Sequence, residues 1–169
     1  MSASAKHIRT LTLSAVFAAL VFLATAYLPR IPFPGGYAHV GDAFLYLAAC
    51  MLPTPWACAA GAVGAGLADA MTGYLIWAPG TAVIKAAITL AFTAKGDRIL
   101  SPRNLLGVIP AGVITVGGYY LYELLLTGSP AAGAASIWFN CLQAVASAVV
   151  FLALGTLMDC TGLKGKLLK

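Results

Sequence analysis

Charged side chains are scarce in this sequence. Ten Lys or Arg residues and five Asp or Glu residues make up 9% of its 169 residues, against about 25% in an ordinary soluble domain. So few charges cannot cover the surface of a soluble domain of this length. The 61% of hydrophobic residues excludes a disordered chain as well, because disordered chains are polar and rich in charge. What is left is a polytopic membrane protein, with a single domain over residues 1–169.

Residues that carry metal or catalytic chemistry are equally few. The two histidines, His7 and His39, are expected on opposite sides of the membrane, and one histidine cannot make a metal site. The four cysteines form no Cys-x-x-Cys pair, so we expect them to act as small hydrophobic residues. The sequence has no HExxH motif, no phosphate-binding loop and no Ser/His/Asp set. We therefore expect no metal, no cofactor and no enzyme, and any ATP hydrolysis belongs to another chain.

The basic residues gather in three clusters beside long apolar runs. A nucleic-acid-binding surface would interleave basic and aromatic residues along one face, so we expect no nucleic-acid partner. Clusters of this kind orient membrane helices, because they stay on the cytoplasmic side. With six crossings, all three clusters and both termini face the cytoplasm. The clusters are Lys6 and Arg9; Lys95, Arg98 and Arg103; and Lys164, Lys166 and Lys169.

Charges and clusters of Pro and Gly divide the chain into six apolar segments, which predicts an all-α bundle of six transmembrane helices. The first is long enough to be a retained helix rather than a signal peptide. The second, after a loop over 29–37, is only roughly 17 Å long as a helix, so it is either completed by a loop that dips into the membrane or tucked inside the bundle. The predicted helices are 10–28, 42–52, 56–73, 79–94, 104–126 and 134–158.

Small residues recur four apart in two of these segments. Such faces allow close approach of helix backbones, either within the chain or against a partner subunit. For the third segment we favour packing within the chain. The pairs are Ser14 with Ala18 and Ala15 with Ala19 in the first segment, and Ala57 with Gly61 and Ala60 with Gly64 in the third.

Two charges fall within neighbouring segments. Asp69 lies about a turn from the outer end of the third segment, and Lys85 about two turns from the outer end of the fourth. The short connection over 74–78, which includes Trp77, brings them to similar depth. Because charges at membrane depth are usually paired, we favour a structural ion pair between them over a role in anchoring a ligand.

Polar and aromatic groups gather in the outer halves of the last two segments. Tyr119 and Glu123 share a helix face at i, i+4, and Asn140 and Gln143 share one at i, i+3, with Trp138 expected near its edge. Rings for stacking beside amides and a carboxylate suit a small heteroaromatic ligand. The alternative is an interfacial aromatic belt with polar helix ends.

The first loop closes with two more polar residues. Asp42 comes directly before an apolar run, so we expect it to be the N-cap of the second helix. His39 could contact a ligand or cap the loop, and Tyr37 lies beside it as a further candidate for the binding site.

At full length the chain resembles the substrate-binding S components of energy-coupling-factor (ECF) vitamin transporters. The stretches 36–42 (GYAHVGD), 64–74 (GAGLADAMTGY) and 78–85 (APGTAVIK) are similar to signatures of the branch that includes riboflavin, pyridoxine and hydroxymethylpyrimidine S components. The stretch 15–19 (AVFAA) resembles the face by which S components dock on a transmembrane coupling subunit, which favours docking for the small residues of the first segment.

The resemblance implies a function in the prokaryotic plasma membrane. An S component captures substrate with high affinity under its first loop, then topples against the coupling subunit, driven by two cytoplasmic ATPases. Asn140 and Gln143 resemble positions at which related S components form hydrogen bonds to a heterocyclic ligand. Glu123 would suit a cationic or donor-rich edge, such as that of an aminated pyrimidine, pyridoxamine or a deazaguanine precursor of queuosine. A larger flavin is less favoured.

Two other classes of protein stay open. A small secondary transporter or channel working as an oligomer would transport its solute without ATPase partners. A structural membrane subunit would bind no ligand saturably.

Overall fold

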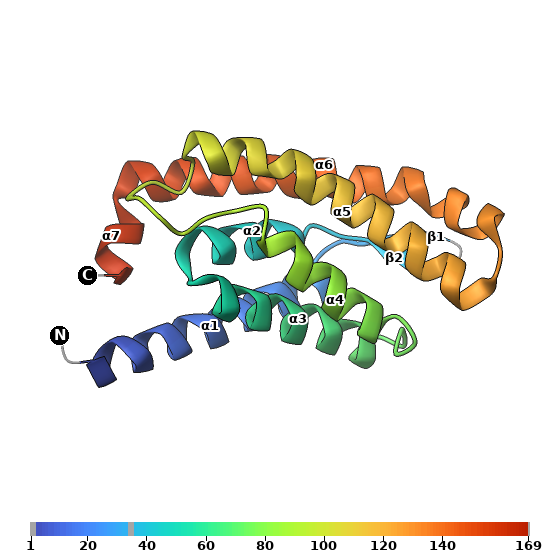
Figure 1. The fold of residues 1–169 in the computed structure, drawn as a ribbon, viewed down its shortest axis with the longest axis horizontal. Coiled ribbons are helices and arrows are strands. Elements are labelled where there is room, and N and C mark those ends of the chain that lie inside the picture. Colours follow the sequence, from blue (N-terminus) through green and yellow to red (C-terminus); the bar gives the residue numbers. More distant parts are fainter. Residues whose placement is uncertain (1–2, 34–35, 169) are drawn as a thin grey trace.

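The chain folds into seven helices and one β-hairpin in a computed structural model that describes residues 3–33 and 36–168 (Figure 1). Met1, Ser2 and Lys169, the last of which belongs to the third basic cluster, lie outside the described residues. The elements are α1 (Ala3–Ala26), β1 (Ile31–Phe33), β2 (Gly36–Ala38), α2 (Asp42–Met51), α3 (Thr54–Met71), α4 (Ala78–Thr89), α5 (Pro102–Thr127), α6 (Pro130–Thr161) and α7 (Leu163–Leu168).

The six long segments are helical, but several of their ends differ from the predicted ones. α1 begins at Ala3 rather than Thr10, and α4 ends at Thr89 rather than Ala94. Serine caps and prolines in the first turn define where α5 and α6 begin, and glycines in the left-handed conformation, Gly128 and Gly162, end them. α7 was not predicted.

A short antiparallel hairpin replaces part of the predicted loop between α1 and α2. Its register pairs Ile31 with Ala38, and Phe33 with Gly36. Pro34 and Gly35 of that loop lie outside the described residues. The hairpin carries Tyr37 and leads directly to His39, so it sets the position of two candidate site residues.

The helices form two layers with α2 between them (Figure 1). α1, α3 and α4 pack side by side in one layer, α5 and α6 pair in the other, and α2 contacts α1, α3, α4 and α6. Close approach of α1 and α3 depends on Gly64, because a Cβ there would collide with the backbone oxygen of Ala18. Every residue of α2 except Phe44 is buried. The short second helix is therefore tucked inside the bundle.

The outer faces of the long helices are apolar, as a membrane protein requires. α1, α5 and α6 are each long and apolar enough to cross a bilayer. Large hydrophobic side chains such as Val113, Leu125 and Val149 are exposed on their surfaces. The chain is thus an α-helical membrane protein, while the six crossings and the cytoplasmic termini remain predictions.

At the end of the bundle that holds both termini, polar side chains fasten the connection between α4 and α5. The buried Asn104 side chain accepts from Thr93 N at 2.9 Å and donates to Ile99 O at 2.9 Å. The Asp159 carboxylate accepts from Ile99 N and Leu100 N at 2.7 and 2.9 Å. These bonds satisfy backbone groups that a non-helical segment would otherwise leave unpaired.

Candidate functional site

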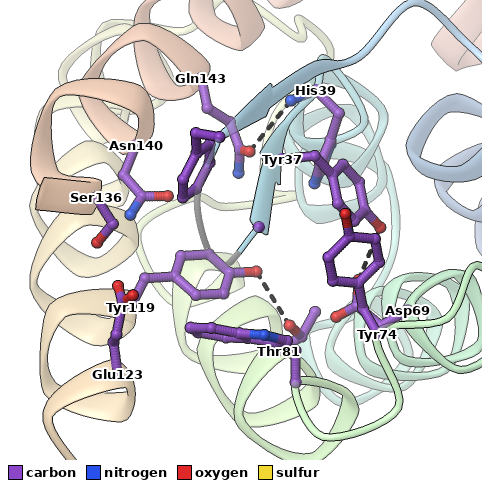
Figure 2. Close-up of a pocket in the computed structure, with 13 residues that line it drawn as sticks. Tyr37, His39, Asp69, Tyr74, Thr81, Tyr119, Glu123, Ser136, Asn140 and Gln143 are labelled. Carbon is purple, nitrogen blue, oxygen red and sulfur yellow. Dashed lines mark hydrogen bonds between the residues drawn. The ribbon is translucent and has the colours of Figure 1, made fainter. Parts of the chain in front are cut away.

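A pocket lies at the opposite end of the bundle, between the hairpin, the α3–α4 connection, α5 and α6 (Figure 2). It contains about 420 Å³ of empty space, counting the solvent in its open mouth. The lining residues come from segments far apart in the sequence. They are Phe33, Gly36, Tyr37, His39, Asp69, Tyr74, Trp77, Thr81, Tyr119, Glu123, Ser136, Asn140 and Gln143.

Aromatic rings form much of the wall. The Tyr37 and Tyr74 rings lie 4.8 Å apart between centroids, and the Trp77 and Tyr119 rings 6.3 Å apart. The hydroxyls of Tyr119 and Thr81 lie 3.2 Å apart and form a hydrogen bond. Rings placed in this way can stack on a flat ligand while their polar atoms stay paired.

Two carboxylates face the pocket from different helices. Asp69 of α3 accepts a hydrogen bond from the Tyr37 hydroxyl at 2.8 Å, which ties the hairpin to the helix. Glu123 of α5 is only 5% exposed, and its Oε2 atom has no hydrogen-bond partner among the described residues. A buried polar atom without a partner costs free energy, so Glu123 has capacity left for a ligand.

The two amide side chains of α6 have different surroundings. Asn140 is 4% exposed and points into the pocket (Figure 2). Gln143 is engaged at both ends, because its Oε1 accepts from His39 N at 3.2 Å and its Nε2 donates to Asp42 Oδ2 at 3.0 Å. Gln143 therefore holds the first loop against α6 and α2, in addition to lining the pocket.

A buried ion pair lies beside the pocket. Lys85 Nζ is 2.7 Å from Asp42 Oδ1 and donates to Asp42 Oδ2 at 2.9 Å, and both side chains are 0% exposed. The predicted pairing of Lys85 with Asp69 is therefore wrong: α2 lies between the layers and presents Asp42 to Lys85 instead. The prediction that Asp42 caps α2 is wrong as well. The N-cap is Gly41, with no side-chain cap.

His39 closes the first loop as an acceptor. Its Nδ1 accepts from Gly41 N at 3.0 Å, and its own backbone N–H is bound by Gln143. Burial lowers the pKa of His39 from its ordinary 6.5 to about 4, because desolvation disfavours the charged ring. The imidazole is thus neutral at pH 7. Within residues 3–33 and 36–168, no group of three His, Cys, Asp or Glu side chains is placed to hold a metal ion.

Comparison with known proteins relates this architecture to a transporter family. The family model of the ECF-type riboflavin transporter S component matches residues 5–159. An uncharacterized protein from the gap 3' region of Pyrococcus woesei is 33% identical over 138 residues, which cover 79% of this chain and 91% of that relative.

The chain belongs to the ECF-type riboflavin transporter S component family. It is therefore a non-enzymatic, substrate-binding membrane subunit of a vitamin transporter. The match spans the hairpin, the pocket residues and every helix except α7.

The S component brings most of the predicted site residues to one place. The pocket gathers Tyr37, His39, Asp69, Trp77, Tyr119, Glu123, Asn140 and Gln143. Lys85 does not line it, although its Nζ lies 5.1 Å from the centre of the Tyr119 ring. Trp138 is 72% exposed and points away, because two residues of an α-helix turn it about 200° from Asn140. Its prediction as a site residue is wrong.

Five lining residues were missed: Phe33, Gly36, Tyr74, Thr81 and Ser136. Ser136 could have been found, since it lies four residues before Asn140 on the buried stripe of α6. Phe33 and Gly36 carried no such signal, because the pairing of the hairpin brings them to the pocket.

The small residues of α1 divide into two faces. Ser14 is buried, and Ala18 packs against Gly64 of α3, so these two serve packing within the S component rather than docking. Ala15 and Ala19 are exposed and stay available to a partner helix.

Proposed function

We propose that this S component captures a small heteroaromatic vitamin or vitamin precursor with high affinity and delivers it to an ECF module. The observation that carries this proposal is the pocket, which combines aromatic walls with a buried Asn140 and a buried Glu123, whose Oε2 has no hydrogen-bond partner among the described residues. Rings suit stacking on a heterocycle, and the polar groups suit reading its edge. Candidate ligands are pyridoxine or pyridoxamine, hydroxymethylpyrimidine, a deazaguanine precursor of queuosine, and riboflavin.

The partners in this proposal are a transmembrane coupling subunit and two cytoplasmic ATPases. Support comes from the exposed Ala15 and Ala19 on α1, and from family membership. The chain itself carries no nucleotide-binding motif in its sequence, so the energy would come from those subunits.

The proposed topology has six crossings of the plasma membrane with both termini in the cytoplasm. The described members of the three basic clusters lie at the same end of the bundle, away from the pocket. Lys6, Arg9 and Lys95 line one shared groove there, and Lys164 donates to Ala94 O at 3.0 Å. Because basic clusters stay on the cytoplasmic side, the pocket would open to the outside.

Equilibrium binding and uptake together test this function. The purified chain should bind one of the candidate ligands saturably, and uptake of that ligand into cells should require co-expression of the coupling subunit and both ATPases. Uptake without the ATPases would instead support a secondary transporter or channel. Absence of saturable binding across the candidates would support a structural subunit.

A further inference from the structure

The acidic side chains that line the pocket have no basic lysine or arginine among the described residues of the lining. They are Asp69 and Glu123. His39 adds no positive charge at neutral pH, because burial lowers its pKa to about 4. The lining therefore offers two carboxylates to a ligand and no cation to balance them.

Lys85, a base near the pocket, is already neutralised. Its Nζ lies 2.7 Å from Asp42 Oδ1, and both side chains are fully buried. A close buried pair of this kind satisfies its own charges, and among the described residues Lys85 forms no ion pair with Asp69 or Glu123. Lys85 also lies over the Tyr119 ring rather than in the cavity.

Glu123 is the carboxylate with the clearest need for a donor. Its side chain is buried, with 5% of its surface exposed. Its Oε2 atom has no hydrogen-bond partner among the described residues. Three hydroxyls of the lining have partners elsewhere: Ser136 donates to Gly133 O at 2.9 Å, and the Tyr119 and Thr81 hydroxyls bond to each other. A carboxylate without a donor at such a site is costly, and a ligand could remove that cost.

The groups near Glu123 are those that a flat cationic ligand requires. Asn140 points into the same space and offers both a donor and an acceptor to a ring edge (Figure 2). The Tyr119 and Trp77 rings border it, and aromatic faces attract cations as well as rings.

We infer that the site selects a heteroaromatic ligand that carries a protonated amine, which donates to Glu123 while Asn140 pairs with the polar edge of the ring. This inference rests on the proposed function, namely that the pocket is the substrate site. Replacement of the ammonium by a neutral group of similar size exchanges a charge-assisted hydrogen bond for a weaker contact. The ligand should therefore be bound more tightly than its neutral twin.

Matched pairs of probes test the inference on the purified full chain by equilibrium binding at pH 7. One pair is pyridoxamine and pyridoxine, which differ by an aminomethyl in place of a hydroxymethyl group. The other is 7-aminomethyl- and 7-cyano-7-deazaguanine, and riboflavin is the fifth probe. We expect the amine of at least one pair to bind about tenfold or more tightly than its twin, a difference of about 1.4 kcal/mol. Glu123→Gln should abolish most of that preference, whereas Asp97→Asn, at an exposed position, should leave it intact.

Each other outcome counts against the inference. Equal or tighter binding of the neutral twins, or of riboflavin alone, overturns it and leaves the proposed function standing. Persistence of the preference in Glu123→Gln places the amine elsewhere and overturns the role of Glu123. Failure of all five probes, and of hydroxymethylpyrimidine as a sixth, to bind overturns the proposed function itself. The wild-type comparison decides the preference for a cation even where Glu123→Gln cannot be purified.

Discussion

At the scale of single residues, the polar groups beside and around the pocket have separate tasks. Lys85 and Asp42 neutralise each other, Gln143 fastens the first loop, and Glu123 and Asn140 line the pocket, where we propose that they bind the ligand. Substitutions should therefore separate stability from binding, and three predictions follow this division.

Lys85→Met should destabilise the protein by about 3–5 kcal/mol, because it leaves Asp42 charged and unpaired in the interior. Addition of Asp42→Asn should recover part of the loss, since it removes that charge. Asp69→Asn should have a smaller effect on stability than Lys85→Met, because Asp69 does not contact Lys85 in an ion pair. Melting temperatures in detergent measure all three. A larger loss of stability in Asp69→Asn than in Lys85→Met would contradict the Lys85–Asp42 pair and favour the Lys85–Asp69 pair predicted from the sequence.

Asn140→Ala and Gln143→Ala should differ in their effect on the fold. Asn140→Ala should weaken ligand binding about tenfold or more with little change in melting temperature, because it removes a group aimed at the ligand. Gln143→Ala should lower both the ligand affinity and the melting temperature, because it also removes the hydrogen bonds to His39 N and Asp42. Trp138→Ala, on the exposed face of α6, is the control and should alter neither. Binding and melting temperature are measured on the same preparations.

The stability of the protein should depend on His39 in acid. The pKa of His39 is about 4 in the folded protein and 6.5 when unperturbed, so below about pH 6.5 the unfolded chain binds a proton that the folded chain does not. Stability is complete above pH 6.5 and falls toward pH 4, by about 2 kcal/mol at pH 5. His39→Asn keeps an acceptor for Gly41 N but does not titrate. Parallel slopes of melting temperature against pH in both proteins would contradict the prediction.

At the scale of elements, α1 presents two different faces of small residues. Its Ser14 and Ala18 face packs inward, where Ala18 meets Gly64 of α3, while Ala15 and Ala19 point outward. An exposed face of small residues allows another helix to approach closely. The two faces should therefore respond differently to a bulky side chain.

Ala15→Trp or Ala19→Trp should block transport but preserve ligand binding by the isolated chain, because the clash is with the coupling subunit. Ala18→Trp should instead lower the melting temperature, because it separates α1 from α3. Val113→Trp, at an exposed position of α5, controls for added bulk and should leave transport unchanged. Loss of binding in Ala15→Trp, or normal transport, would exclude this face as the docking surface.

At the scale of the whole molecule, the two ends of the bundle have opposite character. The hairpin lies at one end and both termini at the other (Figure 1). The pocket is at the end with the hairpin, and the basic groove is at the end with the termini. The proposed function makes use of this polarity, with substrate entering at the pocket end and the proposed partners acting at the other end.

Labelling of single cysteines in intact cells tests the orientation. In a background without native cysteines, Arg30→Cys, next to the hairpin, should react with an impermeant reagent, whereas Lys95→Cys should react only after permeabilisation. Both positions are exposed, so burial does not explain a difference. The reverse pattern would place the pocket on the cytoplasmic side.

The local sequence determined the helices and their buried stripes. Apolar runs, serine and proline at helix starts and glycine at helix ends need only neighbouring residues to act. For the same reason the shared faces of Tyr119 with Glu123, and of Asn140 with Gln143, followed from helical periodicity alone.

Only the tertiary structure decided which groups meet. Asp42 and Lys85 are 43 positions apart, and His39 and Gln143 104 positions apart, so their contacts depend on where α2 and the hairpin enter the bundle. An ion pair forms with whichever opposite charge packing brings within reach, and burial of α2 between the two layers made that charge Asp42 rather than Asp69. Long-range packing therefore paired Lys85 with Asp42, engaged both ends of Gln143 and left Glu123 Oε2 without a hydrogen-bond partner among the described residues.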